Sequence, residues 1–137
     1  MANKIWSFPD DIDSVDVEVI RSVRPNLLLC GPADAVNTTL TTLRPSLQQP
    51  VYKWVGDAGG SLPHEFSGTL IFEHASAARE EQQRLLLEWL SEHARGVQVI
   101  STTEEPLFAL VQQGAFLDRL FYQLNTLYLD LGCEEPS

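Results

Sequence analysis

The sequence is poor in cysteine, in basic side chains and in long apolar runs, and each shortage excludes a class of protein. Two cysteines, Cys30 and Cys133, are too few for a disulfide framework, so a reducing compartment is expected. The 9 lysines and arginines against 19 acidic residues give a net charge of -10, which opposes binding to nucleic acid or anionic lipid. No apolar run approaches the roughly 20 residues of a membrane span, and the first residues lack the apolar core of a signal peptide. We therefore expect a cytoplasmic protein that contacts neither nucleic acid nor membrane directly.

The 137 residues are expected to form a single domain, because the chain is close to the commonest domain length. Its hydrophobic fraction of 44% and charged fraction of 20% are typical of globular proteins. An amphipathic pattern over 10–23 predicts a short helix in an N-terminal extension, 1–22. The core is expected over 23–131, followed by an acidic tail, 132–137.

Apolar runs predict five strands. Residues 26–30 are apolar without alternation, which is typical of a strand buried on both faces, and 68–73 and 97–102 are similar. Residues 51–55 alternate, as in a strand nearer a sheet edge, and 126–131 predict a fifth strand.

Helical patterns fill the intervals between these strands. The clearest helix is expected to follow a Ser76 cap, since Leu86 and Leu90 lie four residues apart on one apolar face. Strands that alternate with helices predict an α/β fold in three α-β-α layers with a mainly parallel five-stranded sheet. The helices are expected at 37–43, 77–93, 106–113 and 116–124.

Four stretches follow one another along the chain: Gly68–His74 reads GTLIFEH, 81–86 is rich in Gln and Leu, Val99–Thr103 reads VISTT, and Gly114–Asn125 reads GAFLDRLFYQLN. In the same order they resemble motifs of the AAA+ ATPase core, specifically of the central domain of sigma-54-dependent transcription activators. The family motifs are GTLFLDE, a Gln- and Leu-rich helix after it, a strand ending in Ser-Thr-Thr, and GxFRxDLYYRLN. The resemblance covers 23–131 and implies a P-loop NTPase core, here without the helical lid of the family.

The resemblance places a P-loop from Gly31 to Thr38, where the motif requires G-x-x-x-x-G-K-[ST]. Gly31 matches the first glycine of the motif, and Thr38 matches its final Ser or Thr. Val36 replaces the second glycine, Asn37 replaces the lysine, and Asp34 brings a negative charge to a loop that should bind an anion. Gly31 and Thr38 are therefore interpreted as vestigial nucleotide-binding positions, and neither ATP nor Mg²⁺ is expected as a cofactor.

Two further catalytic positions of the family are altered. Glu73 stands at the position of the Mg²⁺-binding aspartate and is a third vestigial site residue, while His74 replaces the glutamate that activates water. The interfacial arginines of the family align with Leu117 and Gln123, and Arg119 lies out of register. ATP hydrolysis is therefore not expected, and the chain is interpreted as a pseudo-ATPase with no catalytic residues.

The expected function is a noncatalytic interaction or regulatory module linked to bacterial transcription regulation. Its expected partner is a protein, either a second copy of this chain or a complete AAA+ activator. Because the sigma-contacting insertion of the family is absent between Val55 and Gly68, sigma-54 remodelling by this chain alone is not expected. The candidate exposed anchors, which alternatively cover the sheet edge, are Trp6, Phe8, Trp54 and Phe66.

Two alternative functions use other residues. A nucleotide-binding sensor or weak ATPase would use Thr38 and Glu73 in an altered pocket. A small-molecule enzyme would use His74 or Cys30, although a cysteine that ends an apolar strand favours a core position. Metal binding by His64, Glu73 and His74 has no recognised ligand spacing, so no metal is expected.

Overall fold

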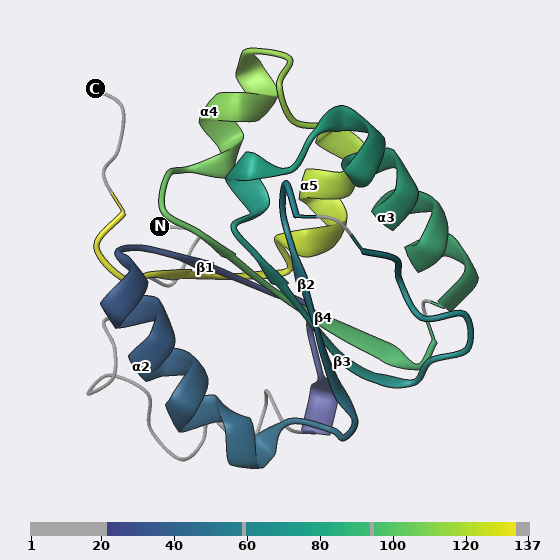
Figure 1. Ribbon diagram of the computed structural model, residues 1–137. Coiled ribbons are helices and arrows are strands. Elements are labelled where there is room, and N and C mark those ends of the chain that lie inside the picture. The colour runs from purple at the N-terminus through teal and green to yellow at the C-terminus, as the bar shows by residue number, and fades with distance from the viewer. Residues whose placement is uncertain (1–21, 59, 94, 134–137) are drawn as a thin grey trace.

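In the part of the chain that the structure describes, five parallel strands form the centre of the fold (Figure 1). The computed structural model describes residues 22–58, 60–93 and 95–133. Within these ranges the strand order is β2-β3-β4-β1-β5, and every neighbouring pair is parallel. The strands are β1 (Leu27–Cys30), β2 (Val51–Val55), β3 (Gly68–Glu73), β4 (Val97–Thr103) and β5 (Leu127–Asp130).

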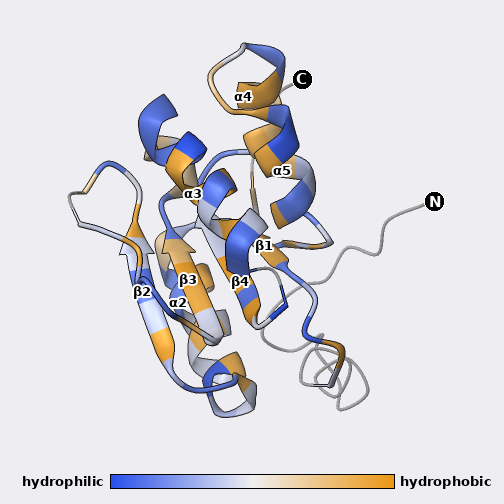
Figure 2. Cartoon of the chain, turned by 90° about the vertical axis from the view of Figure 1, so that its right-hand side faces the viewer, coloured by the Kyte–Doolittle hydropathy of each residue, from blue (hydrophilic) through white to orange (hydrophobic). Residues whose placement is uncertain are grey.

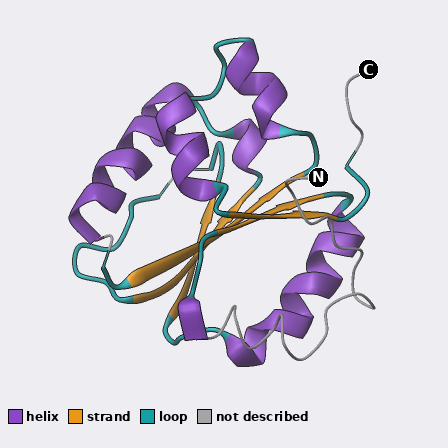
Figure 3. Cartoon of the chain, turned by 180° about the vertical axis from the view of Figure 1, so that it is seen from behind, coloured by secondary structure: helices purple, strands orange, loops and turns teal. Residues whose placement is uncertain are grey.

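Helices cover both faces of this sheet, and the expected three-layer α/β architecture is confirmed. One face is covered by α2 and the other by α3, α4 and α5 (Figures 1 and 3). The helix expected over 10–23 lies outside the described residues except for Ser22 and Val23, which are helical. The described helices are α2 (Ala33–Leu43), α3 (Glu80–His93), α4 (Leu107–Gln112) and α5 (Asp118–Leu124), with 3₁₀ turns η1 (Arg44–Ser46) and η2 (Ala75–Ala77).

The central strand β1 is buried on both faces, as its unbroken apolar run predicts. Leu27 and Leu29 pack in the cluster under α2, whereas Leu28 packs in the cluster under α3, α4 and α5. Figure 2 shows that β3, another strand of this sheet, is also largely hydrophobic. None of the described helices is long and apolar enough to cross a bilayer.

Two helices begin at residues other than those expected. The chain stays extended only as far as Pro32, so α2 begins at Ala33 instead of residue 37, and the Val36 N–H donates to the Pro32 carbonyl at 3.0 Å. Ser76 lies in η2 and does not cap α3, which begins at Glu80. The Gln82 side-chain oxygen instead accepts the Arg79 N–H at 3.1 Å, one half of a capping box.

His93 ends α3 and holds the loop that precedes β3. Its Nδ1 lies 2.8 Å from the Trp89 carbonyl oxygen, its Nε2 lies 2.8 Å from the His64 carbonyl oxygen, and its ring stacks on Trp89. Both ring nitrogens face acceptors, so the doubly protonated ring satisfies both. The hydrogen bond to the Trp89 carbonyl contributes most to raising the pKa of His93 above 6.5, followed by the hydrogen bond to the His64 carbonyl. The nearby Glu92 charge also raises this pKa, while burial lowers it.

This raised pKa predicts a pH-dependent stability. Because the pKa of His93 is higher in the folded than in the unfolded chain, its stabilisation is fully present below the unfolded pKa and is lost as pH rises through the folded pKa. We expect the difference in unfolding free energy between the wild type and His93→Gln to shrink as pH rises from about 5.5 to about 8.5. Urea denaturation across this range measures the difference, and equal pH slopes for the two proteins would contradict it.

Candidate functional site

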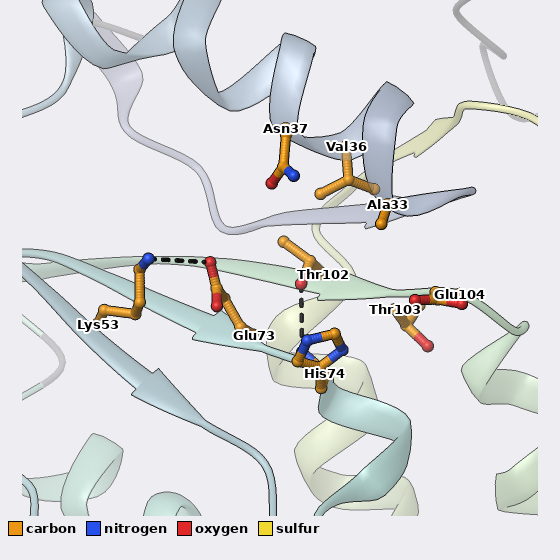
Figure 4. A pocket seen from close by; sticks show the side chains of 9 residues that line it. All are labelled: Ala33, Val36, Asn37, Lys53, Glu73, His74, Thr102, Thr103 and Glu104. Carbon is orange, nitrogen blue, oxygen red and sulfur yellow. Dashed lines mark hydrogen bonds and ion pairs between the residues drawn. The ribbon is translucent and has the colours of Figure 1, made fainter.

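A pocket opens where the carboxyl ends of β3 and β4 approach the first turns of α2 (Figure 4). Its volume is about 280 Å³, just below the usual size of ligand sites. The carboxyl edge of a parallel sheet is where such folds bind ligands. The pocket is lined by Ala33, Val36, Asn37, Lys53, Glu73, His74, Thr102, Thr103 and Glu104.

The turn between β1 and α2 is too short to wrap a phosphate. Pro32 has no N–H, the Gly31 N–H donates to the Thr103 carbonyl at 3.0 Å, and the Val36 N–H is used within α2. The Ala35 N–H lies 2.9 Å from its neighbour's carboxylate, Asp34 Oδ1. In a P-loop, backbone N–H groups of this segment point at the phosphates, whereas here most of them are already paired.

The residues at the lysine and hydroxyl positions of the motif, Asn37 and Thr38, are also poorly suited to bind phosphate or Mg²⁺. Asn37 is exposed and lines the pocket, but it carries no charge. Thr38 does not line the pocket, and its hydroxyl donates to the Asp34 carbonyl at 2.9 Å within α2.

Gly31 stands at the first glycine position of the motif, and the packing of the turn leaves no room for a side chain there. A Cβ added at Gly31 would lie 2.7 Å from Leu131 Cβ and 2.8 Å from the Leu131 carbonyl oxygen. Real Cβ atoms do not approach so closely. Because Leu131, the residue after β5, packs against this turn, the turn requires glycine.

Glu73 forms an ion pair with Lys53 across two strands. Lys53 Nζ lies 3.4 Å from Glu73 Oε2, and the Glu73 side chain is 19% exposed against 55% for Lys53. The pairing of β2 with β3 puts both residues on the α2 face of the sheet, where Val51 and Ile71 also lie. The carboxylate that would hold Mg²⁺ therefore already has a cation beside it. These residues do not fit Mg²⁺-bound nucleotide in the manner of a P-loop site.

Sequence reasoning missed Lys53, although the alternation in β2 carried a signal. Tyr52 and Trp54 pack on the opposite face, so Lys53 had to lie on the face that Glu73 occupies once β2 and β3 are neighbours. The missing information was the strand order.

His74 adopts a left-handed backbone conformation, with φ 56°, directly after β3. Its backbone N–H donates to Thr102 Oγ1 at 3.2 Å, and its exposed side chain lines the pocket (Figure 4). Its neighbour Glu73 forms an ion pair with Lys53.

The residues aligned with the interfacial arginines lie away from the pocket. Leu117 precedes α5 and is half-buried, while Gln123 and Arg119 are exposed on α5. The residues proposed for a metal are also separated, because the His64 carbonyl contacts His93 at the far end of α3. Among the described residues no group of His, Cys, Asp or Glu side chains is placed to hold a metal ion.

The candidate aromatic anchors do not form an exposed set. Trp54 is 3% exposed and packs against Phe72, and Phe66 is half-buried against Trp89, so both belong to the core and its margin. Trp6 and Phe8 lie outside the described residues. The expectation for Trp54 as an exposed anchor was therefore wrong, because the alternation in β2 turns it toward α3.

The two cysteines form a disulfide, a pairing that the sequence did not predict. Cys30 and Cys133 are paired with their Cα atoms 5.2 Å apart, across a sequence separation of 103. Parallel pairing of β1 with β5 brings their carboxyl ends together, which no sequence spacing indicates.

The strand order and the glycine turn after β1 define an α/β fold of the P-loop NTPase class, and solved structures share it. NtrX from Brucella abortus in complex with ATP matches with a TM-score of 0.66 and 15% identity, over 84% of this chain and 33% of that chain. The ADP complex of NtrX gives 0.64 and 19%, over 85% and 34%. A P-loop NTPase domain of the sigma-54 transport activator from E. coli gives 0.56 and 16%, over 83% and 95%.

The family follows from the sequence. The pattern of the sigma-54 interaction domain matches residues 16–132, and the chain therefore belongs to this family. It spans about a third of the length of the NtrX chains that it matches. A search of curated proteins gave no significant match.

Proposed function

We propose that this member of the sigma-54 interaction domain family is a noncatalytic interaction or regulatory module that does not hydrolyse ATP. The observation that carries the proposal is the early start of α2 at Ala33, since most backbone donors of the P-loop segment are then paired within the protein. A phosphate would have to displace these hydrogen bonds, and Asp34 would repel it.

The ion pair between Lys53 and Glu73 supports the same proposal. A Mg²⁺ ion at Glu73 would have to displace the ammonium group of Lys53 or tolerate its positive charge. The two groups together bring no net charge to the pocket, so they provide no strong field for a triphosphate. Arg119 is exposed on α5 and lies outside the pocket, so it does not supply the missing charge.

The proposed partner is a protein in the bacterial cytoplasm, either a second copy of this chain or a complete AAA+ activator. Exposed apolar side chains on α3, α4 and α5 support a protein contact, since Leu85, Phe108 and Tyr122 are 44%, 46% and 65% exposed. Light scattering at high concentration tests self-association. A strict monomer that also binds no AAA+ activator would contradict the proposal.

The proposal predicts no response to nucleotide. We expect no heat on titration with millimolar ATP or ADP and Mg²⁺, and no phosphate release above background. Nucleotide at a concentration 100 times its Kd would stabilise the folded chain by about 2.7 kcal/mol, which would raise the melting temperature by several degrees. NtrX from Brucella abortus, whose solved complexes contain ATP or ADP, is the positive control.

A double variant separates a lost motif from a lost loop. Val36→Gly with Asn37→Lys restores the motif letters, but we expect it to bind nucleotide no better, because residues 33–36 are helical and Lys53 stays beside Glu73. Binding by the wild type would favour the nucleotide-sensor alternative. Binding by the double variant alone would show that the two side chains, rather than the backbone, exclude nucleotide.

A further inference from the structure

The Cys30–Cys133 pair joins the edge strand β5 to the strand that holds it. Within the described sheet β5 pairs only with β1, over Leu27–Cys30 and Leu127–Asp130. Cys30 is the last residue of β1, and Cys133 follows the end of β5 by three residues. Figure 1 shows β5 at the edge of the sheet beside β1. The disulfide therefore links the carboxyl end of β1 to the segment that follows the carboxyl end of β5.

The turn after β5 is built to return Cys133 to this position. Asp130 Oδ1 accepts the N–H groups of Gly132 at 3.0 Å and of Cys133 at 2.9 Å. Gly132 has φ +107°, which a glycine adopts without strain. The Asp130 carboxylate therefore holds the turn by hydrogen bonds that do not involve the cysteine sulfurs.

The same turn accommodates a thiol. Cys133 Sγ lies 3.8 Å from the Glu104 carbonyl oxygen, an acceptor that a thiol S–H group can use. Cys133 is 8% exposed, whereas Cys30 is fully buried. An external thiol or disulfide therefore reaches Cys133 first, and Cys30 lies within bonding range to resolve the intermediate.

We propose that Cys30 and Cys133 are a reversible oxidation site that exchanges with low-molecular-mass disulfides such as oxidised glutathione. The Cys133 thiolate attacks one sulfur of oxidised glutathione and releases one glutathione thiolate. The Cys30 thiolate then attacks the Cys133 sulfur of the mixed disulfide and releases the second. The two protein thiols lose two protons and two electrons in total, and oxidised glutathione gains them as two glutathione thiols. Excess reduced glutathione runs both steps in reverse.

Oxidation fastens β5 to the sheet. In the dithiol form the edge strand is held by the ladder with β1, by the Leu131 N–H that donates to the Cys30 carbonyl at 2.7 Å, and by side-chain packing. In the disulfide form its exit is bonded to β1 and the chain between the cysteines becomes a closed loop, which constrains the unfolded state. Disulfides in reducing compartments are mostly of this reversible, redox-sensing kind. The inference does not depend on nucleotide binding or on any protein partner.

Thiol counting in the full chain tests the reaction. After equilibration with oxidised glutathione and denaturation, both cysteines are expected to resist alkylation, and both are expected to react when denaturation follows transfer to excess reduced glutathione. Cys133→Ser leaves Cys30 without a partner, so its thiol is expected to react after denaturation in either buffer. A wild-type pair that stays alkylatable in oxidised glutathione, or that stays oxidised in excess reduced glutathione, would overturn the proposal.

Hydrogen exchange tests the consequence for β5. Amides of residues 127–133 are expected to exchange at least about tenfold faster in the dithiol form than in the disulfide form. Cys133→Ser and Cys30→Ala are expected to show the fast rate in both buffers. Two different variants are used so that a folding defect in one does not decide the outcome, and equal rates in the two wild-type forms would contradict the fastening of β5.

Discussion

Replacing Gly31 with alanine is expected to destabilise the protein by about 3 kcal/mol, at the upper end of the cost of overpacking a core. The added Cβ would lie 2.7 Å from Leu131 Cβ and within 3 Å of two backbone atoms of Leu131. The backbone of Leu131 cannot withdraw freely, because its N–H donates to the Cys30 carbonyl at 2.7 Å. The clash therefore separates β5 from β1 or shifts the turn at Pro32.

Chemical denaturation without nucleotide measures this cost. The exposed neighbour Ala33 provides the control, because Ala33→Ser also adds one heavy atom and is expected to change stability by less than about 0.5 kcal/mol. If Gly31 were retained for phosphate alone, Gly31→Ala would leave the stability of the nucleotide-free chain unchanged. Equal stability of the two variants would contradict the structural role assigned to Gly31.

The central strands were predictable because a strand buried on both faces consists of consecutive apolar residues, and such a run is visible in the sequence. Leu27, Leu28 and Leu29 form an unbroken apolar run, and each is at most 1% exposed. The edge position of β2 was equally readable, because Lys53 interrupts its apolar residues. Local pattern thus determined which strands lie inside the sheet, while their order depended on contacts far apart in sequence.

Helix starts were harder to predict, because they depend on side chains that reach back to the backbone. Ser76 is a good cap by residue type, but His74 takes a left-handed conformation and the chain makes a 3₁₀ turn before α3. Gln82 supplies the hydrogen bond at the start of α3. Nothing in the sequence distinguished this glutamine from an exposed helix residue.

The site was predictable only in part. Of the three residues interpreted as vestigial nucleotide-binding positions, Gly31 and Thr38 do not line the pocket, whereas Glu73 does. Its ion pair with Lys53 and the pairing of the two cysteines follow from the adjacency of β2 with β3 and of β5 with β1. One sequence contains no record of those adjacencies.

Gln83 is nearly fully buried and fastens α3 to the turn that begins α5. Its Nε2 donates to the carbonyls of Ala78 at 2.9 Å and of Ala115 at 3.0 Å, and its Oε1 accepts the Leu117 N–H at 2.8 Å. The side chain is 1% exposed, so its amide has exchanged all contact with water for these three bonds. Leu117 directly precedes α5, and its N–H would otherwise be one of the unpaired donors of the helix start.

Gln83→Leu is expected to destabilise the protein by about 3 kcal/mol, because it leaves partly buried backbone groups without partners at a cost of about 1–3 kcal/mol each. Gln112→Leu makes the same chemical change on the exposed surface of α4 and is expected to cost less than about 0.5 kcal/mol. Urea denaturation compares the two variants, and hydrogen exchange locates the change. The Gln83 variant should lose protection first at residues 115–121, because only this segment loses its tie to α3. Uniform loss of protection over the whole sheet, or a cost equal to that of Gln112→Leu, would show that α5 is positioned by apolar packing of Leu120 and Leu124 alone.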